Sequence, residues 1–197
     1  MKSRVQAVLF DLDGTLVDSM AVHFEAYRHV FEELGLRIDF QTFLACSGGP
    51  ARDTIPRLID GRRCSLEPSE IHVRKVAVAK RLFREMKPRA LATAALLPVL
   101  GTHWPLGLVS SGSRASVSLV LEVMGWESTF RIVISGDDVY RGKPDPEGYL
   151  NAARAVEADP CACLVFEDAD DGIAAARCAG MQVIDVRECV PAWRFVT

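Results

Sequence analysis

The chain has 197 residues, of which 49% are hydrophobic and 25% charged, and its formal net charge is -3. This apolar content is enough for a domain core, which excludes a disordered chain, and the mixed charges provide no basic surface for nucleic acid. Because no apolar run approaches the ~20 residues that span a bilayer, and the N-terminal run is too short for a signal peptide, we expect a cytoplasmic protein without membrane contact, a monomer or weak homodimer, that acts on a small molecule.

The first predicted element is a short apolar strand, Val5 to Phe10, which ends at Asp-Leu-Asp-Gly. A run that is apolar on both faces is typical of a strand buried inside a parallel sheet. After the turn, apolar residues recur every three or four positions from Met20 to Leu34, and Gly35 follows. This spacing predicts an amphipathic helix that stops at the glycine.

The next segment changes character. From about Phe40 to Met86 the sequence shows helical patterns and no convincing strand. Its helical stretches cover 42–46, 54–59 and 69–86. We interpret residues 18–87 as a small α-helical cap that is inserted after the first strand.

After Lys87-Pro88, apolar strands alternate with helices. The predicted strands cover 106–110, 132–135, 163–166 and 182–186. The predicted helices between them cover 113–124, 147–157 and 172–179. Such alternation indicates a parallel sheet that is covered on both faces. We therefore predict an α/β fold, a Rossmann-like open parallel sheet with helices on both faces, formed by residues 1–17 and 88–197.

In such sheets ligands bind outside the carboxyl ends of the strands, so the residues at those ends are the candidates for chemistry. The first strand ends in Asp11-Leu12-Asp13. Side chains two positions apart in an extended chain share a face, so both carboxylates can point into one crevice. A turn cap explains one aspartate, but not readily two beside an apolar strand.

The other strand ends carry polar residues as well. Ser110 to Ser113 lead into a helix, where hydroxyls and backbone N–H groups either bind an anion or act as an ordinary N-cap. Lys143 lies in a proline-flanked loop, which either holds its ammonium in place or is a surface turn. Glu167 and Asp168 end the fourth strand itself, so a role as helix caps does not explain them.

Together these strand ends describe one kind of site. Several carboxylates in one crevice repel each other unless a hard cation such as Mg²⁺, which prefers oxygen ligands, lies between them. An anion-binding helix end and a lysine on the same edge complete the set. Carboxylates, Mg²⁺, an anion site and one lysine are what phosphoryl transfer requires.

In order and spacing, four motifs of this chain resemble those of the haloacid dehalogenase superfamily. They are Asp11-x-Asp13-Gly14-Thr15, Ser111 after the second strand, Lys143 in Gly-Lys-Pro, and Glu167-Asp168 in FEDADDGIAAARCAGM. The resemblance covers essentially the whole core, and the helical insert is similar to the small α-helical cap of that superfamily. The cap and the last third of the chain resemble the β-phosphoglucomutase-like branch, particularly its sugar-phosphate phosphatases of the fructose-1-phosphatase type.

The resemblance implies a role for each carboxylate. Asp11 would be the nucleophile that forms an aspartyl-phosphate, and Asp13 would be first the general acid and then the general base. Asp11, the backbone carbonyl of Asp13, and Asp168 would hold Mg²⁺. Glu167 would position a water molecule on the metal.

The resemblance also implies how the phosphoryl group is held. Ser111, the backbone N–H of the following Gly112, and Lys143 would contact the transferring oxygens. In the cap, three residues fall near positions where the branch places hinge and substrate-contacting residues: His23, Arg52 and Lys75. Each of these three is otherwise a surface residue.

The leading hypothesis is a Mg²⁺-dependent phosphatase of small phosphorylated metabolites, in particular sugar phosphates. A sugar-phosphate mutase of the β-phosphoglucomutase type is the alternative, and it requires a second phosphate site in the cap. A non-catalytic binding module on the same fold is the alternative from a different class. Asp13 disfavours a dehalogenase, because phosphoryl transfer needs this second carboxylate.

Overall fold

Five parallel strands form the sheet at the centre of the computed structural model, which describes residues 5–47, 51–61 and 64–188. The strands lie in the order β5-β4-β1-β6-β7. Their bounds are Ala7–Phe10 for β1, Leu106–Val109 for β4, Ile132–Ile134 for β5, Cys163–Glu167 for β6 and Gln182–Asp185 for β7. The predicted parallel sheet is therefore confirmed, with each strand within two residues of its predicted bounds.

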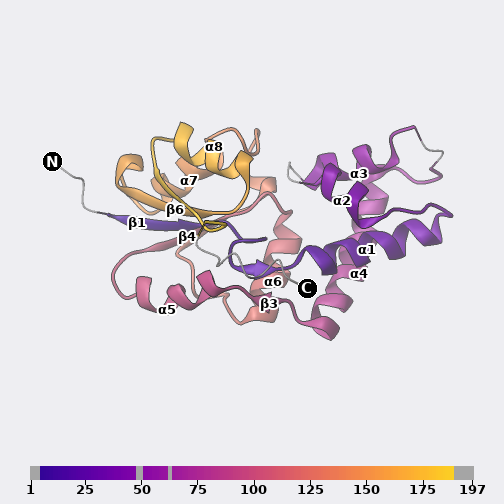
Figure 1. Ribbon diagram of the computed structural model, residues 1–197, viewed down its shortest axis with the longest axis horizontal. Coiled ribbons are helices and arrows are strands. Elements are labelled where there is room, and N and C mark those ends of the chain that lie inside the picture. The colour runs from indigo at the N-terminus through magenta and orange to yellow at the C-terminus, as the bar shows by residue number, and fades with distance from the viewer. Residues whose placement is uncertain (1–4, 48–50, 62–63, 189–197) are drawn as a thin grey trace.

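Helices cover both faces of this sheet (Figure 1). On one face lie α5 and α6, and on the other lie α7 and α8. Their bounds are Leu97–Leu100 for α5, Arg114–Met124 for α6, Glu147–Ala155 for α7 and Asp170–Cys178 for α8. The predicted Rossmann-like arrangement is confirmed. The short α5 lies in the segment after residue 88, for which the sequence pattern indicated no helix.

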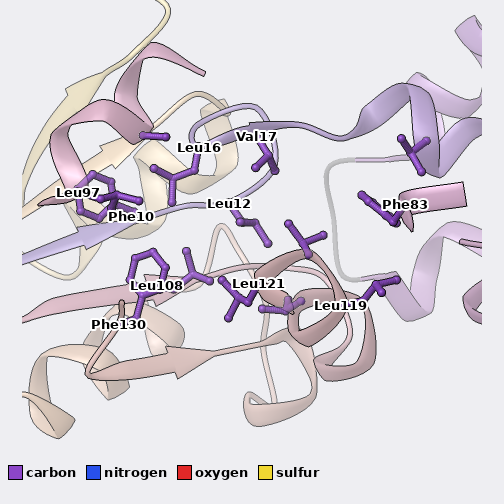
Figure 2. Close-up of a cluster of buried hydrophobic side chains, with 14 of the residues drawn as sticks. Phe10, Leu12, Leu16, Val17, Phe83, Leu97, Leu108, Leu119, Leu121 and Phe130 are labelled. Carbon is purple, nitrogen blue, oxygen red and sulfur yellow. The ribbon is translucent and has the colours of Figure 1, made fainter. Parts of the chain in front are cut away.

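The central strand β1 divides the core into two hydrophobic clusters. Val8 and Phe10 belong to the cluster beneath α5 and α6, whereas Ala7 and Leu9 belong to the cluster beneath α7 and α8. All four side chains are buried, because successive residues of a strand point to opposite faces. Figure 2 shows part of the first cluster, which extends from Phe10 on the strand to Phe83 outside the sheet.

Four helices form a second body beside the sheet, which we call the helical lobe (Figure 1). They are α1 (Met20–Glu33), α2 (Phe40–Cys46), α3 (Ala51–Ile59) and α4 (Pro68–Met86). The lobe has its own buried cluster, which includes Tyr27, Phe31, Phe43, Ile55 and Ile71. Helix α4 also packs on the sheet side, because Leu82 and Phe83 near its end belong to the cluster of Figure 2.

A two-stranded antiparallel ribbon joins the helical lobe to the sheet. It pairs β2 (Val17–Asp18) with β3 (Arg89–Ala90), and Arg89 forms an ion pair with Asp18 at 3.3 Å. The sequence gave no indication of this ribbon, since two residues are too few to show a strand period. The ribbon lies next to the predicted boundaries at 17/18 and 87/88, but the division into a core and a cap stays a prediction.

Within the described ranges, no helix combines the length and apolar character needed to cross a bilayer.

Candidate active site

The carboxyl ends of three neighbouring strands bring the predicted site residues together. Asp11 follows β1, Ser110 follows β4, and Glu167 ends β6, and these strands are adjacent in the order β4-β1-β6. A cavity of about 350 Å³ lies between this edge and the helical lobe. All predicted site residues except Arg52 line it. Arg52 belongs to α3, but its side chain lies outside the described residues.

Lys143 lies between two buried carboxylates of this edge. Its Nζ lies 2.6 Å from Asp11 Oδ1 and 2.5 Å from Glu167 Oε1. Burial alone would lower the pKa of this ammonium, but Asp11, Tyr149 and Glu167 beside it raise the pKa well above its ordinary value. Lys143 therefore stays protonated. The predicted loop does hold the ammonium in the crevice, and the alternative of a surface lysine is wrong.

Glu167 is fully buried and hydrogen-bonded at both oxygens. Oε2 accepts from the backbone N–H groups of Asp168 at 2.8 Å and Ala169 at 2.9 Å. Oε1 accepts from Lys143 and, at 3.1 Å, from the Tyr149 hydroxyl. Residue 172 must be a glycine, because a Cβ there would lie 1.7 Å from Glu167 Oε1.

Asp168 lies over the first turn after β1. Its Oδ1 accepts a hydrogen bond of 3.0 Å from the Thr15 hydroxyl. Its Oδ2 occupies the space beside Gly14, where a Cβ would come within 2.1 Å, and Gly14 has a φ of 92°. Burial, together with the charge of Glu167, raises the pKa of Asp168 to about 6. The close approach of the Asp168 side chain to the backbone of Gly14 thus explains the glycine in the Asp-x-Asp-Gly motif.

Three carboxylates of this edge lie close enough together to hold a metal ion. Asp11, Glu167 and Asp168 each offer an oxygen, and these oxygens lie within 4.8 Å of one another. Burial, with the charges of Glu167 and Asp168, also raises the pKa of Asp11 well above its ordinary value, although Lys143 opposes this. Buried acids whose charged forms are disfavoured and whose ligand atoms are all oxygen fit a hard divalent cation. The Asp13 carboxylate does not belong to this group.

Asp13 instead faces the helical lobe. Its Oδ1 accepts a hydrogen bond from the Ser19 hydroxyl and lies 3.6 Å from His23 Nε2. His23 Nδ1 is in turn 3.0 Å from Lys75 Nζ. The structure thus connects Asp13, His23 and Lys75 in one chain of contacts, although the last two are far apart in sequence. Lys75 is only 5% exposed, so it is not the surface residue of the alternative interpretation.

Burial and charge shift each group in this chain. Burial would raise the pKa of Asp13, but hydrogen bonds from His23 and Ser19 and the charge of Lys75 lower it. Burial and the neighbouring Lys75 lower the pKa of His23. Burial lowers the pKa of Lys75 to about 8. An ionised aspartate therefore faces a histidine and a lysine that both release protons more readily than usual.

The serine-rich turn after β4 forms another side of the cavity. Ser111, Gly112 and Ser113 all line it. Ser113 is the N-cap of α6, since its hydroxyl accepts from the backbone N–H of Ser116, as the capping interpretation predicted. The N–H of Gly112, which we expected to contact phosphate, is donated to Ser110 Oγ at 3.0 Å. A phosphoryl group would have to compete for this donor.

The sequence analysis missed several residues of this site. Thr15, Ser19 and Tyr149 each bond to a predicted carboxylate. Thr15 lies in the recognised motif and Ser19 precedes the first predicted helix, so their positions were a usable signal. Tyr149 had none, because an aromatic residue in an amphipathic helix is ordinary core. The helical side of the cavity adds further residues that the sequence did not indicate: Met20, Phe43, Leu44, Thr54 and His72.

The fold and the strand-end carboxylates define an α/β protein with a phosphoryl-transfer type of site. The haloacid dehalogenase-like hydrolase family matches residues 8–186, so the chain belongs to this family. Fructose-1-phosphate phosphatase YqaB of Escherichia coli (strain K12) is 33% identical over 190 residues, which cover 95% of this chain and 99% of the relative. β-Phosphoglucomutase of Bacillus subtilis (strain 168) is 26% identical over 195 residues, which cover 95% of this chain and 85% of the relative.

A solved structure supports the same fold. The crystal structure of CbbY from Rhodobacter sphaeroides in complex with phosphate superimposes with a TM-score of 0.85 and 24% identity, covering 92% of this chain and 85% of the other. The resemblance to the β-phosphoglucomutase-like branch is thus confirmed. The chain is a phosphatase of the haloacid dehalogenase type, which hydrolyses phosphate monoesters.

Proposed function

We propose that the protein is a Mg²⁺-dependent phosphatase of small sugar phosphates that works through an aspartyl-phosphate on Asp11. The observation that carries this proposal is the contact of Asp11 with Lys143, at the bottom of a cavity that Asp13 enters from the side. A carboxylate nucleophile beside a fixed ammonium and a second carboxylate is the minimum set for a two-step phosphoryl transfer.

In the first step an oxygen of Asp11 attacks phosphorus and the ester oxygen leaves. Lys143 and the serine-rich turn at Ser111 contact the phosphoryl oxygens, whose charge is spread outward in the transition state. Lys143 fits this role because it stays protonated and is already directed at the attacking residue.

In both steps Asp13 moves the proton. It first takes up a proton through His23 and gives it to the leaving alcohol, and then takes one from the water that attacks the aspartyl-phosphate. The contacts of its carboxylate with Ser19 and His23 hold it toward the cavity and away from the acidic cluster. His23, with Lys75 behind it, is a group from which Asp13 can take the proton for the first step, because the pKa values of both His23 and Lys75 are lowered.

The acidic cluster suits Mg²⁺, for which Asp11, Asp168 and Glu167 would supply side-chain oxygens and Asp13 its backbone carbonyl. When bound, the cation neutralises charge on the phosphoryl oxygens and keeps the nucleophile ionised. The raised pKa values of Asp11 and Asp168 support this assignment, because a cation between the two carboxyls would favour their ionised forms.

The helical lobe would act as the cap that covers the substrate. It supplies hydroxyl and imidazole groups from Thr54 and His72 beside apolar side chains, which suits a small sugar. A mutase needs a second phosphate site here. Lys75 is a cation that lines the lobe side of the cavity, but its ammonium already contacts His23, which disfavours a role in binding a second phosphate. The similarity to YqaB, whose name specifies fructose 1-phosphate, also favours a sugar-phosphate phosphatase.

The test is phosphate release from a panel of sugar monophosphates, with and without Mg²⁺. We expect the wild type to release phosphate only with Mg²⁺, and Asp11→Asn and Asp13→Ala to release none. Asp18→Asn, an exposed carboxylate in β2, is the matched control and should behave as wild type. Absence of turnover on every ester would overturn the proposal in favour of a binding module, and isomerised product without free phosphate would establish a mutase.

A further inference from the structure

Tyr149 lies directly beneath the proposed reaction centre, and none of the steps above uses it. The side chain is 0% exposed and comes from the first turn of α7. Its hydroxyl donates to Glu167 Oε1 at 3.1 Å, and the centre of its ring lies 5.3 Å from Lys143 Nζ. One side chain thus contacts both the ammonium and its buried counter-ion.

The hydroxyl and the ammonium share a single acceptor. Glu167 Oε1 accepts hydrogen bonds from both Tyr149 and Lys143, while Oε2 accepts hydrogen bonds from two backbone N–H groups. These four donors hold the Glu167 carboxylate in one orientation. The Tyr149 hydroxyl is the donor in this contact, because a carboxylate oxygen can only accept. The direction of Oε1, and with it the position of Lys143 Nζ, depends on this hydrogen bond.

The chain between the two residues is also held in place. Lys143 and Tyr149 are separated by five residues, which include Pro144 and Pro146. The Glu147 carboxylate accepts the backbone N–H groups of Tyr140 at 2.9 Å and Arg141 at 3.0 Å, which ties the start of α7 to the lysine loop. The ring of Tyr149 therefore packs beside Lys143 Nζ from a segment whose backbone is restrained.

We propose that Tyr149 is a positioning residue, whose ring and hydroxyl hold Lys143 at the point where it meets Asp11 and the transferring phosphoryl group. The inference rests on the proposed function. A preorganised charge lowers the barrier only if it is held next to the phosphoryl oxygens, because their charge develops at fixed positions in the transition state. Loss of the hydroxyl leaves Lys143 charged but allows it to follow Glu167 away from Asp11.

The decisive variant is Tyr149→Phe, which keeps the ring and its volume and removes only the donor. We expect kcat to fall about tenfold with KM within twofold, because the lost positioning acts on the transition state rather than on substrate binding. Tyr140→Phe removes a tyrosine hydroxyl from a side chain that is 92% exposed, and should match wild type.

Inhibition by orthovanadate separates positioning from a merely structural role. Vanadate mimics the five-coordinate phosphorus, so its inhibition constant should weaken in Tyr149→Phe by about the same factor as kcat, because both depend on transition-state contacts. The inhibition constant of inorganic phosphate should change less than twofold. Thermal unfolding of each variant establishes that the measured enzyme is folded.

Two results would overturn the inference: a kcat of Tyr149→Phe within twofold of wild type, or a lower kcat with unchanged vanadate inhibition. Failure of the proposed function is a different result, since wild type and Tyr140→Phe would then also release no phosphate. If Tyr149→Phe fails to fold, Tyr149→His, which offers a ring and an N–H donor, takes its place. Its kcat must then exceed that of Tyr149→Leu, and equal values would overturn the inference.

Discussion

The two walls of the cavity are constructed differently. On the wall at the sheet edge, charged side chains are fixed by each other and by backbone N–H groups, as Glu167 is by Lys143 and the turn after β6. On the wall of the helical lobe, Met20, Phe43 and Leu44 are apolar. From this wall the contact chain of His23 and Lys75 carries charge to the reaction centre. We infer that the chemistry depends on the sheet edge and that the lobe determines which substrates enter.

Burial shifts the pKa values of the ionisable groups on the two walls in opposite directions. At the sheet edge burial raises the pKa values of Asp11 and Asp168, which means that this wall has too little positive charge to neutralise its carboxylates. In the lobe burial lowers the pKa values of His23 and Lys75, so the wall holds its protons loosely. Asp13 lies where they meet. A cation bound at the sheet edge and a proton passed from the lobe to Asp13 resolve both imbalances.

The largest difference between the walls should appear when a lysine is removed from each. Lys143→Ala takes away a charge that contacts the transferring group, and we expect kcat to fall by ~10²–10³. Lys75→Ala acts only through His23, and we expect a loss of about tenfold, as for the support of a general acid. Steady-state kinetics with one sugar phosphate measures both. Equal losses in the two variants would contradict the proposed division of labour.

A glycine pair tests how tightly the sheet edge is packed. In Gly14→Ala the new Cβ would meet Asp168 Oδ2 at 2.1 Å, so we expect the Mg²⁺ concentration for half-maximal activity to rise more than tenfold. Gly35→Ala is the matched control, with a φ of 70° but open space around the Cβ. It should lose only the ~1–2 kcal/mol in free energy of unfolding that a left-handed residue costs. Urea unfolding and Mg²⁺ titration distinguish the two, and an unchanged Mg²⁺ requirement in Gly14→Ala would contradict the packing argument.

The pH dependence of Mg²⁺ activation tests the charge deficit of the same wall. The pKa of Asp168 is raised to about 6, so below that pH the carboxyl is protonated and the metal must displace the proton. We expect the Mg²⁺ concentration for half-maximal activity to rise as pH falls from 7 to 5, by up to about tenfold per pH unit for one proton. Above pH 7 it should be constant. A constant value down to pH 5 would show that Asp168 does not hold the metal.

The smallest effect is expected on the apolar part of the lobe wall. Leu44 is an apolar residue of the cavity lining on the lobe side, so Leu44→Ala should raise KM for a sugar phosphate a few-fold, by about 1 kcal/mol of lost contact, and leave kcat unchanged. Val73→Ala is the control, since Val73 lies on α4 outside the cavity and is highly exposed. A fall in kcat for Leu44→Ala would give the lobe a share in the chemistry.

The sequence predicted one wall well and the other poorly, for a physical reason. Parallel strands place their carboxyl ends at one edge, so Asp11, Lys143 and Glu167 could be assigned to one site from the strand pattern alone. The lobe wall depends on how helices pack, which hydrophobic spacing does not specify. His72 and Thr54 therefore escaped notice, and His23 and Lys75 were named only through resemblance. The β2–β3 ribbon and α5 escaped because none of these elements spans more than about one period of its pattern.

Tyr149 marks a different limit of prediction. Its hydroxyl bonds to Glu167, which lies 18 residues further along the chain at the end of β6. Aromatic residues at helical spacing are mostly core, and Tyr149 does belong to the buried cluster on the α7 and α8 side of the sheet. Only the three-dimensional position of one polar atom separates a packing residue from a positioning one.

The central position of β1 has a consequence for local opening of the protein. Its backbone is hydrogen-bonded to β4 on one side and to β6 on the other, and its side chains are buried on both faces. Amides in such a strand exchange with solvent only when much of the domain unfolds. The nucleophilic Asp11 is thus attached to the segment that opens last, whereas an exposed helix such as α2 can open and close many times while the reacting carboxylate stays in place.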